Sequence, residues 1–150
     1  MKGVHPDTGP VFHAIRQLPL LEEYMLVGGT AISLQIGHRS EKDIDHVRLA
    51  DLYSLGVMKL DVMFRRNVFR DYYDVYAILK KGVGLKEIVE GAGRYSKHRV
   101  GTKMILSILS DGTRFRREEG FGLLQPLYDI DSDEIEAFLR ERITGEFALS

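Results

Sequence analysis

The chain has 150 residues, of which 44% are hydrophobic and 29% are charged, and its formal net charge is −1. This length is sufficient for one domain with its own core, and the near-zero charge argues against a protein that binds nucleic acid through bulk charge alone. Cysteine is absent, which excludes disulfide bonds, a thiolate nucleophile and a cysteine-based zinc site.

The N-terminal segment from Met1 to Gly9 contains Pro6 and two glycines and is expected to be a loose leader. It lacks the basic-then-apolar pattern of a signal peptide, and no apolar run in the chain is long enough to span a bilayer. We therefore expect a cytoplasmic protein without membrane contact. The stretch Val11 to Leu18 has the apolar spacing of a short helix that ends near Pro19.

The next part of the chain predicts a strand, a glycine turn, a helix, a second turn and a second strand. Tyr24 to Val27 is an apolar run of strand length, and it ends at Gly28 and Gly29. Thr30 to Ile36 is expected to be helical, and Asp43 to Val47 alternates like a strand after a polar turn. A strand–helix–strand core at about residues 20–47 follows from this order.

The remainder, at about residues 48–150, is predicted to be mainly helical. Apolar residues recur there with helical spacing, and acidic residues occupy the first turn of the last helix, where they suit its dipole. The stretch 111–131 lacks such a pattern and is expected to be a loop. The predicted helical segments are 49–64, 72–79, 85–90, 103–109 and one that begins at Ser132.

Asp43 and Asp45 are separated by a single residue. On a strand both side chains project from the same face, while Ile44 points into the core; on a helix they would lie roughly 200° apart. Two adjacent carboxylates repel each other unless a hard cation lies between them. Mg²⁺ fits this role because it takes one or two carboxylates and completes its shell with substrate phosphates. We therefore expect Asp43 and Asp45 to bind Mg²⁺.

The glycine pair supplies a complementary phosphate site. Gly28 and Gly29, at the junction of a strand and a helix, let a phosphate approach the backbone, and the helix N-terminus offers free N–H groups. A triphosphate there could reach a metal on the two aspartates, which suits in-line attack on the α-phosphorus. The alternative is a tight turn beside a chance Asp-x-Asp. The sequence contains neither a Walker A pattern nor an EF-hand loop.

Three stretches together resemble the first motif of the AbiEii/AbiGii toxin family, within the polymerase-β-like nucleotidyltransferases. They are Leu26–Leu34, Gly37–Ser40 and Asp43–Asp45. The family motif has a glycine pair, a small residue, a helix, a His-Arg-x-Ser-like turn and an Asp-x-Asp.

Later stretches resemble the family's remaining motifs, a lysine helix followed by a helix with Arg…(Lys/Arg)-Asp-x-x-Asp. Leu49 to Leu60 contains the lysine, and Arg66 to Tyr76 contains the second pattern. The resemblance extends roughly from Tyr24 to Leu79.

The resemblance implies specific roles. Lys59 would neutralise the triphosphate, and Asp74, assisted by Asp71, would position or deprotonate the acceptor. Lys59, Arg66 and Arg70 fall within about 40° of one another on an unbroken helix. In the alternative interpretation, Lys59 is solvated and Arg70 pairs with Asp74 on the surface. The implied nucleotide-binding residues are Gly28, Gly29, Thr30, Arg39, Ser40 and Lys59, and the implied catalytic residues are Asp43, Asp45, Lys59 and Asp74.

We expect a single α+β domain over residues 1–150, with a small nucleotidyltransferase-like sheet and a helical C-terminal half. The function implied by the resemblance is Mg²⁺-dependent transfer of NMP from an NTP to an RNA, such as a tRNA, or to a protein. The chain would be the toxin of a bacterial toxin–antitoxin or abortive-infection system, with a cognate antitoxin as partner.

The sequence departs from the family pattern after Asp45. In the family, a stretch with a further strand and the third metal carboxylate precedes the lysine helix, whereas here Val47 to Asp51 already belongs to the later motif. Either the protein carries an internal deletion near His46–Val47, or a segment encoded there is missing from this chain. The sheet would then be incomplete. This departure motivates the alternative of a catalytically inactive remnant that binds nucleotide or a partner protein.

Two basic clusters offer candidate RNA contacts, with Phe115 available for base stacking, although solvated surface is the simpler interpretation. The acidic stretch from Asp129 to Glu141 is a candidate partner surface with the same alternative. The basic clusters are Arg94, Lys97, His98, Arg99 and Lys103, and Arg114, Arg116 and Arg117.

Overall fold

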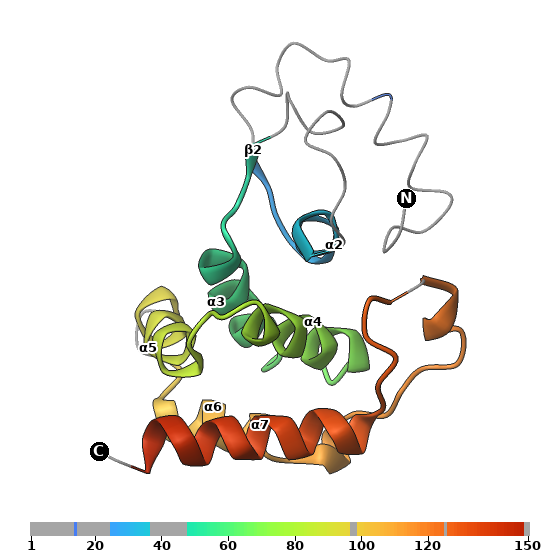
Figure 1. Cartoon of the computed structure of the whole chain (residues 1–150). Coiled ribbons are helices and arrows are strands. Elements are labelled where there is room, and N and C mark those ends of the chain that lie inside the picture. Colours follow the sequence, from blue (N-terminus) through green and yellow to red (C-terminus); the bar gives the residue numbers. More distant parts are fainter. Residues whose placement is uncertain (1–13, 15–24, 37–47, 97–98, 125, 149–150) are drawn as a thin grey trace.

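The computed structural model describes residues 14, 25–36, 48–96, 99–124 and 126–148 (Figure 1). The expected leader, the 11–18 helix apart from the helical Ala14, and the Asp43–Val47 strand lie outside these residues. In chain order the elements are β1 (Met25–Leu26), α2 (Gly29–Ile36), β2 (Arg48–Leu49), α3 (Leu52–Val62), α4 (Phe69–Lys80), α5 (Leu85–Tyr95), α6 (Thr102–Leu109), the 3-10 helices η3 (Gly112–Arg114) and η4 (Phe121–Leu124), and α7 (Ser132–Phe147).

The described sheet consists of two short parallel strands. Met25 of β1 lies opposite Arg48 of β2, and the Ala50 N–H donates to the Leu26 carbonyl at 3.1 Å, just beyond the strands. Parallel strands need a crossover connection, and α2 lies in the segment that links them. The described part of the chain is thus mostly helical with a small sheet, compatible with the expected α+β class.

The second strand corrects the prediction that the helical stripe begins at Leu49. Leu49 belongs to β2, and α3 begins only at Leu52. The reason is local: the Asp51 side chain accepts a hydrogen bond from the Ser54 N–H at 2.8 Å, so Asp51 caps the helix and holds the chain before it in an extended conformation. β2 therefore passes into α3 through Ala50 and Asp51.

Three helices, α3, α4 and α5, form the middle of the molecule, with β1, β2 and α2 on one side and α6 and α7 on the other (Figure 1). Glycines let α3 and α5 pack closely. A Cβ on Gly91 would lie 2.6 Å from Val57 Cγ2, and one on Gly56 would lie 3.0 Å from Ile88 Cγ2. Larger residues at either position would push the helices apart.

Helix α4 is buried on nearly all sides, and aromatic rings surround its first half. Phe115 stacks on Tyr72 with ring centroids 3.7 Å apart, and Phe69 contacts both Phe115 and Phe121. Phe115 is only 2% exposed. The expectation that Phe115 could stack on an RNA base is therefore wrong, because its ring fills the core beside α4.

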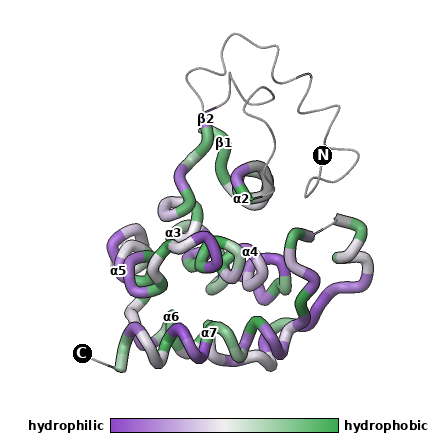
Figure 2. The backbone as a smooth tube through the Cα atoms, in the orientation of Figure 1, coloured by the Kyte–Doolittle hydropathy of each residue, from purple (hydrophilic) through white to green (hydrophobic). Residues whose placement is uncertain are grey.

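The C-terminal helix begins at Ser132, as predicted, but Asp131 is its cap. The Asp131 side chain accepts from the Glu134 N–H at 2.9 Å, and the Glu134 side chain accepts from the Asp131 N–H at 2.9 Å. This reciprocal pair fixes the first turn of α7. The preceding stretch, expected to be a loop, contains η3 and η4. Hydrophobic and hydrophilic residues alternate along α7 (Figure 2).

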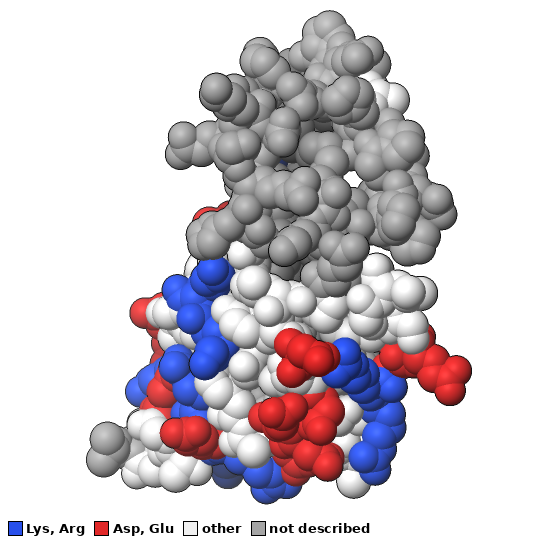
Figure 3. All heavy atoms as spheres, turned by 45° about the vertical axis from the view of Figure 1, so that its right-hand side comes forward, with Lys and Arg blue, Asp and Glu red and all other residues white. Residues whose placement is uncertain are grey.

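Charges of both signs are interspersed on the described surface. On one face, Asp and Glu gather low in the centre with Lys and Arg on both sides, and an uncharged band borders the grey residues (Figure 3). None of the helices within the described ranges is long and apolar enough to cross a membrane.

Candidate functional site

The glycine turn between β1 and α2 faces two charged side chains of the helical part. Gly28 has φ +82°, a conformation that glycine adopts without strain, and Gly29 begins α2. A Cβ built on Gly29 would lie 3.5 Å from Asp74 Oδ2 and 4.0 Å from Lys59 Nζ. The structure therefore places Gly29, Lys59 and Asp74, from three different elements, beside one another.

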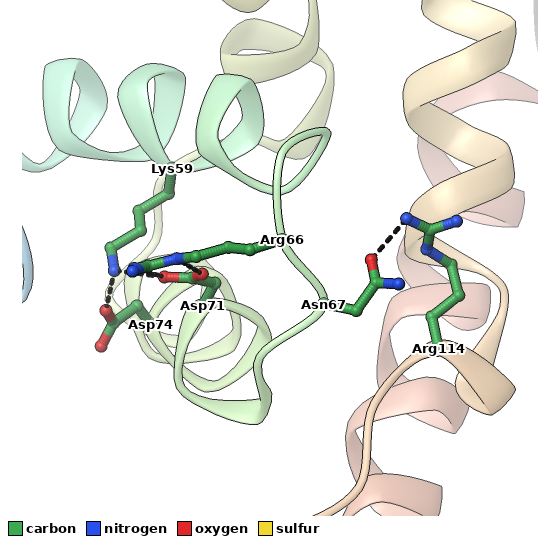
Figure 4. Close-up of polar contacts among 6 residues, drawn as sticks. All are labelled: Lys59, Arg66, Asn67, Asp71, Asp74 and Arg114. Carbon is green, nitrogen blue, oxygen red and sulfur yellow. Dashed lines mark hydrogen bonds and ion pairs between the residues drawn. The ribbon is translucent and has the colours of Figure 1, made fainter.

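Lys59 extends from α3 toward two carboxylates of α4 (Figure 4). Its Nζ lies 2.7 Å from Asp71 Oδ1 and 2.5 Å from Asp74 Oδ2, and Lys59 is 8% exposed. Because Asp71 and Asp74 are separated by three residues on a helix, both can reach the same ammonium group. The alternative interpretation of a solvated Lys59 is wrong.

Arg66 forms the second contact to Asp71. Its Nε lies 2.7 Å from Asp71 Oδ2 and its Nη2 lies 2.9 Å from Asp71 Oδ1, a bidentate arrangement (Figure 4). The spacing of Lys59, Arg66 and Arg70 within about 40° required one unbroken helix, and this condition is not met, because α3 ends at Val62 and α4 begins at Phe69. Lys59 and Arg66 nevertheless both contact Asp71, since the intervening turn directs both side chains toward α4.

Burial and charge act in opposite directions on the pKa of Asp71. Burial raises the pKa, but the hydrogen bonds from Arg66 and Lys59 outweigh it, so the pKa of Asp71 lies below its usual value of 3.8. Burial likewise lowers the pKa of Lys59, yet the charge of Asp74 and the hydrogen bonds to Asp71 and Asp74 raise it above 10.5. Asp71 and Lys59 are thus held in their ionised forms.

Asp74 behaves differently from Asp71. Burial raises the pKa of Asp74 above its usual value of 3.8, and Lys59 offsets this only in part. Two features explain the contrast: Asp74 has no arginine partner among the described residues, and it shares Lys59 with Asp71. A carboxyl group with a raised pKa therefore lies beside the glycine turn.

Other polar contacts connect the site to the C-terminal part of the chain. Arg70 lies 3.4 Å from Glu118 Oε2 and Asp74 pairs with Lys59, so the alternative interpretation of a surface pair between Arg70 and Asp74 is wrong. Arg114 Nη2 donates to Asn67 Oδ1 at 2.5 Å, next to Arg66 in the chain (Figure 4). Sequence reasoning missed this contact, because the two residues are 47 positions apart and no local pattern connects them.

Several predicted site residues lie outside the described part of the chain. They are Asp43, Asp45, Arg39 and Ser40. Thr30 lies in the first turn of α2. No group of three His, Cys, Asp or Glu residues that could hold a metal occurs within the described residues. Asp71 does not fit a metal site, because Lys59 and Arg66 contact both of its oxygens, and Lys59 also contacts Asp74 Oδ2.

Comparison with known proteins finds a matching family model. A family model described as "Nucleotidyl transferase AbiEii toxin, Type IV TA system" matches residues 45–146, more than half of the chain. The matched range contains Lys59, Asp71 and Asp74, whereas the glycine turn precedes it. No curated protein and no solved structure matches the chain.

Proposed function

The chain belongs to the AbiEii nucleotidyl transferase toxin family of type IV toxin–antitoxin systems, and on this basis we propose that it transfers NMP from a Mg²⁺-bound NTP. The proposed acceptor is a hydroxyl group of an RNA, such as a tRNA, or of a protein. The proposed partner is a cognate antitoxin that restrains this reaction.

The convergence of Gly29, Lys59 and Asp74 carries the proposal. The first N–H groups of a helix have no intrahelical acceptor and favour an anion, and a glycine there lets a phosphate approach the backbone. Helix α2 begins at Gly29, directly beside the Lys59 ammonium group. A triphosphate at this turn would contact both the backbone N–H groups and a buried cation.

Lys59 retains a donor for such a ligand. An ammonium group has three N–H donors, and Asp71 and Asp74 accept two of them. The third is free to donate to a phosphate oxygen in the proposed complex. Arg66 would contribute indirectly, since its bidentate contact fixes Asp71 and thereby the direction of the Lys59 side chain.

Asp74 suits the role of proton acceptor. A general base is most effective when its pKa approaches the working pH, and burial moves the pKa of Asp74 upward. Its Oδ2 faces the glycine turn. In the proposed reaction Asp74 takes the proton of the acceptor hydroxyl as that oxygen attacks the α-phosphorus and pyrophosphate leaves.

The proposed metal ligands are Asp43 and Asp45. Two carboxylates with one intervening residue offer the hard oxygen donors that Mg²⁺ prefers. When bound, Mg²⁺ would offset the phosphate charge and stabilise the attacking and leaving oxygens.

Binding of Mg–NTP tests this proposal directly. Asp43→Asn combined with Asp45→Asn is expected to abolish Mg–NTP binding in calorimetry while the circular dichroism spectrum stays unchanged. Asp129→Asn combined with Asp133→Asn removes the same charge at exposed positions and is the matched control. Equal nucleotide affinity in the two double variants would show that the metal assignment is wrong.

The departure after Asp45 supports a second candidate, a remnant that binds nucleotide without transfer. Neither β1 nor β2 contains an acidic residue, and β2 leads through Ala50 and Asp51 directly into α3. A third carboxylate is therefore absent from the described strands. Incubation with α-phosphate-labelled NTP and total RNA or protein separates the candidates, because a remnant binds Mg–NTP but leaves every acceptor unlabelled.

A further inference from the structure

A pocket of about 380 Å³ lies where the C-terminal ends of α3 and α5 meet the segment after α5. Its volume falls in the range of small-ligand sites. This pocket is distinct from the site at the glycine turn. Asp61 lines the pocket and follows Lys59 by two positions on α3, so the two side chains point in directions roughly 200° apart around the helix. The lining residues are Asp61, Phe64, Arg65, Tyr95, Ser96, Arg99 and Val100.

One part of the wall is aromatic and apolar. Phe64 and Val100 are half-buried, whereas Tyr95 is 55% exposed. The Tyr95 side chain makes no hydrogen bond or ring contact within the described ranges. An exposed tyrosine and a half-buried phenylalanine in one wall offer aromatic surface on which a planar ring can stack.

The polar part of the wall carries a cation that is not neutralised. Arg65 lies 3.1 Å from Asp61 Oδ2, so these two charges offset each other. Arg99 is exposed, and its side chain has no hydrogen bond or ion pair with any residue that the structure describes. The pocket therefore combines one available guanidinium group with an aromatic surface, the pairing that suits a planar ring joined to a phosphate.

We propose that this pocket binds one nucleotide unit, free or within single-stranded RNA, with the base against Phe64 and Tyr95 and the phosphate on Arg99. Its size suits one unit, and its chemistry matches the two parts of a nucleotide. The proposal goes beyond the donor site at Gly29 and Lys59, and it stands even if that site binds no NTP.

Two pocket variants with matched controls test the proposal in the full chain. Tyr95→Ala removes the stacking ring, whereas Tyr95→Phe keeps it. Arg99→Glu reverses the pocket charge, and Arg140→Glu makes the same change at an exposed arginine of α7, outside both basic clusters. The probes are AMP, ribose 5-phosphate and a fluorescent single-stranded RNA hexamer, measured by calorimetry and fluorescence anisotropy.

We expect Tyr95→Ala to weaken probe binding by about five-fold or more and Tyr95→Phe to retain it. Arg99→Glu should lose more affinity than Arg140→Glu, and ribose 5-phosphate should bind more weakly than AMP. If AMP competes with the hexamer, the pocket binds a free nucleotide as well as a nucleotide within RNA. If the hexamer binds and AMP does not, the pocket binds only a nucleotide within RNA.

The proposal is overturned if neither AMP nor the hexamer binds, or if the pocket variants behave like their controls. Lys59→Met separates it from the proposed donor site. That variant should weaken Mg–NTP binding and leave hexamer binding unchanged. Loss of hexamer binding in Lys59→Met, with no effect of Tyr95→Ala, would place the RNA at the glycine turn instead.

Discussion

Arg66 binds Asp71 through two hydrogen bonds, Nε to Oδ2 at 2.7 Å and Nη2 to Oδ1 at 2.9 Å, although the two residues lie on either side of the start of α4. Asp71 is completely buried, and its Oδ1 also accepts from Lys59. The turn between α3 and α4, the ionisation of Asp71 and the position of Lys59 therefore depend on one another.

Asp71→Asn should destabilise the protein by about 3–5 kcal/mol, because it removes the carboxylate that pairs with Arg66 and one of the two carboxylates that pair with the buried Lys59. Urea denaturation gives the free energy of unfolding. Asp129→Asn is the control, since Asp129 pairs with Arg117 but its side chain is 86% exposed, and its loss should cost less than about 1 kcal/mol. Similar costs for the two variants would contradict a structural role for the Asp71 contacts.

Asp71 and Asp74 should affect the pH dependence of stability with opposite signs. The pKa of Asp71 is lowered in the folded protein, because hydrogen bonds from Arg66 and Lys59 outweigh the opposing effect of burial. Its contribution is therefore present above pH 3.8 and is lost as the pH falls through the folded pKa. The acid loss of stability should be shallower in Asp71→Asn than in the wild type.

Burial raises the pKa of Asp74, so between pH 3.8 and its folded pKa the folded state holds a proton that the unfolded state has released. Stability from this group accordingly falls as the pH rises through that window. Asp74→Asn removes this titrating carboxyl group. The free energy of unfolding of the variant, relative to that of the wild type, should therefore increase with pH within this window. Denaturant midpoints across the window check the sign, and a relative decrease would show that the pKa of Asp74 is lowered.

Alanine at each glycine of the turn should have a different effect. Gly28 has φ +82° and open space around a Cβ, so Gly28→Ala should cost about 1–2 kcal/mol of stability through backbone strain. Gly29→Ala meets only ordinary contacts and should fold normally, but its methyl group would lie between the turn and Asp74. Mg–NTP affinity should then fall. Unchanged affinity in Gly29→Ala would show that no phosphate approaches there.

Phe115→Ala should destabilise the protein by about 3–5 kcal/mol, because it removes the ring stacked on Tyr72 and leaves a cavity beside α4. Thermal and urea unfolding measure the loss. Leu123→Ala, at an exposed apolar position, is the control and should have little effect. A marginal loss in Phe115→Ala would indicate that its ring is not part of the core.

Much of the fold and part of the candidate site follow from local patterns in the sequence. Apolar spacing predicted the helices around Tyr72, Leu85 and Ser132, because one face of each must enter the core. The glycine pair predicted the junction of strand and helix at Gly29, because the turn needs the positive φ that Gly28 adopts without strain.

The family resemblance identified Lys59, Asp71 and Asp74 as one group, yet sequence alone could not show how they meet. The turn after Val62 directs Lys59 and Arg66 onto Asp71, and this depends on how α3 packs against α4. The position of Phe115 is likewise set by packing, since a single aromatic residue among arginines has no periodicity that identifies its buried face.

The sequence by itself therefore determined most of the helices, the family and the residue types of the candidate site, because these depend on neighbours a few positions apart. Only the tertiary structure decided that Lys59 is shared by two carboxylates, that Asp74 faces Gly29 and that Arg114 reaches Asn67. Such contacts join residues far apart in the chain, and the packing of whole helices sets the distances between them.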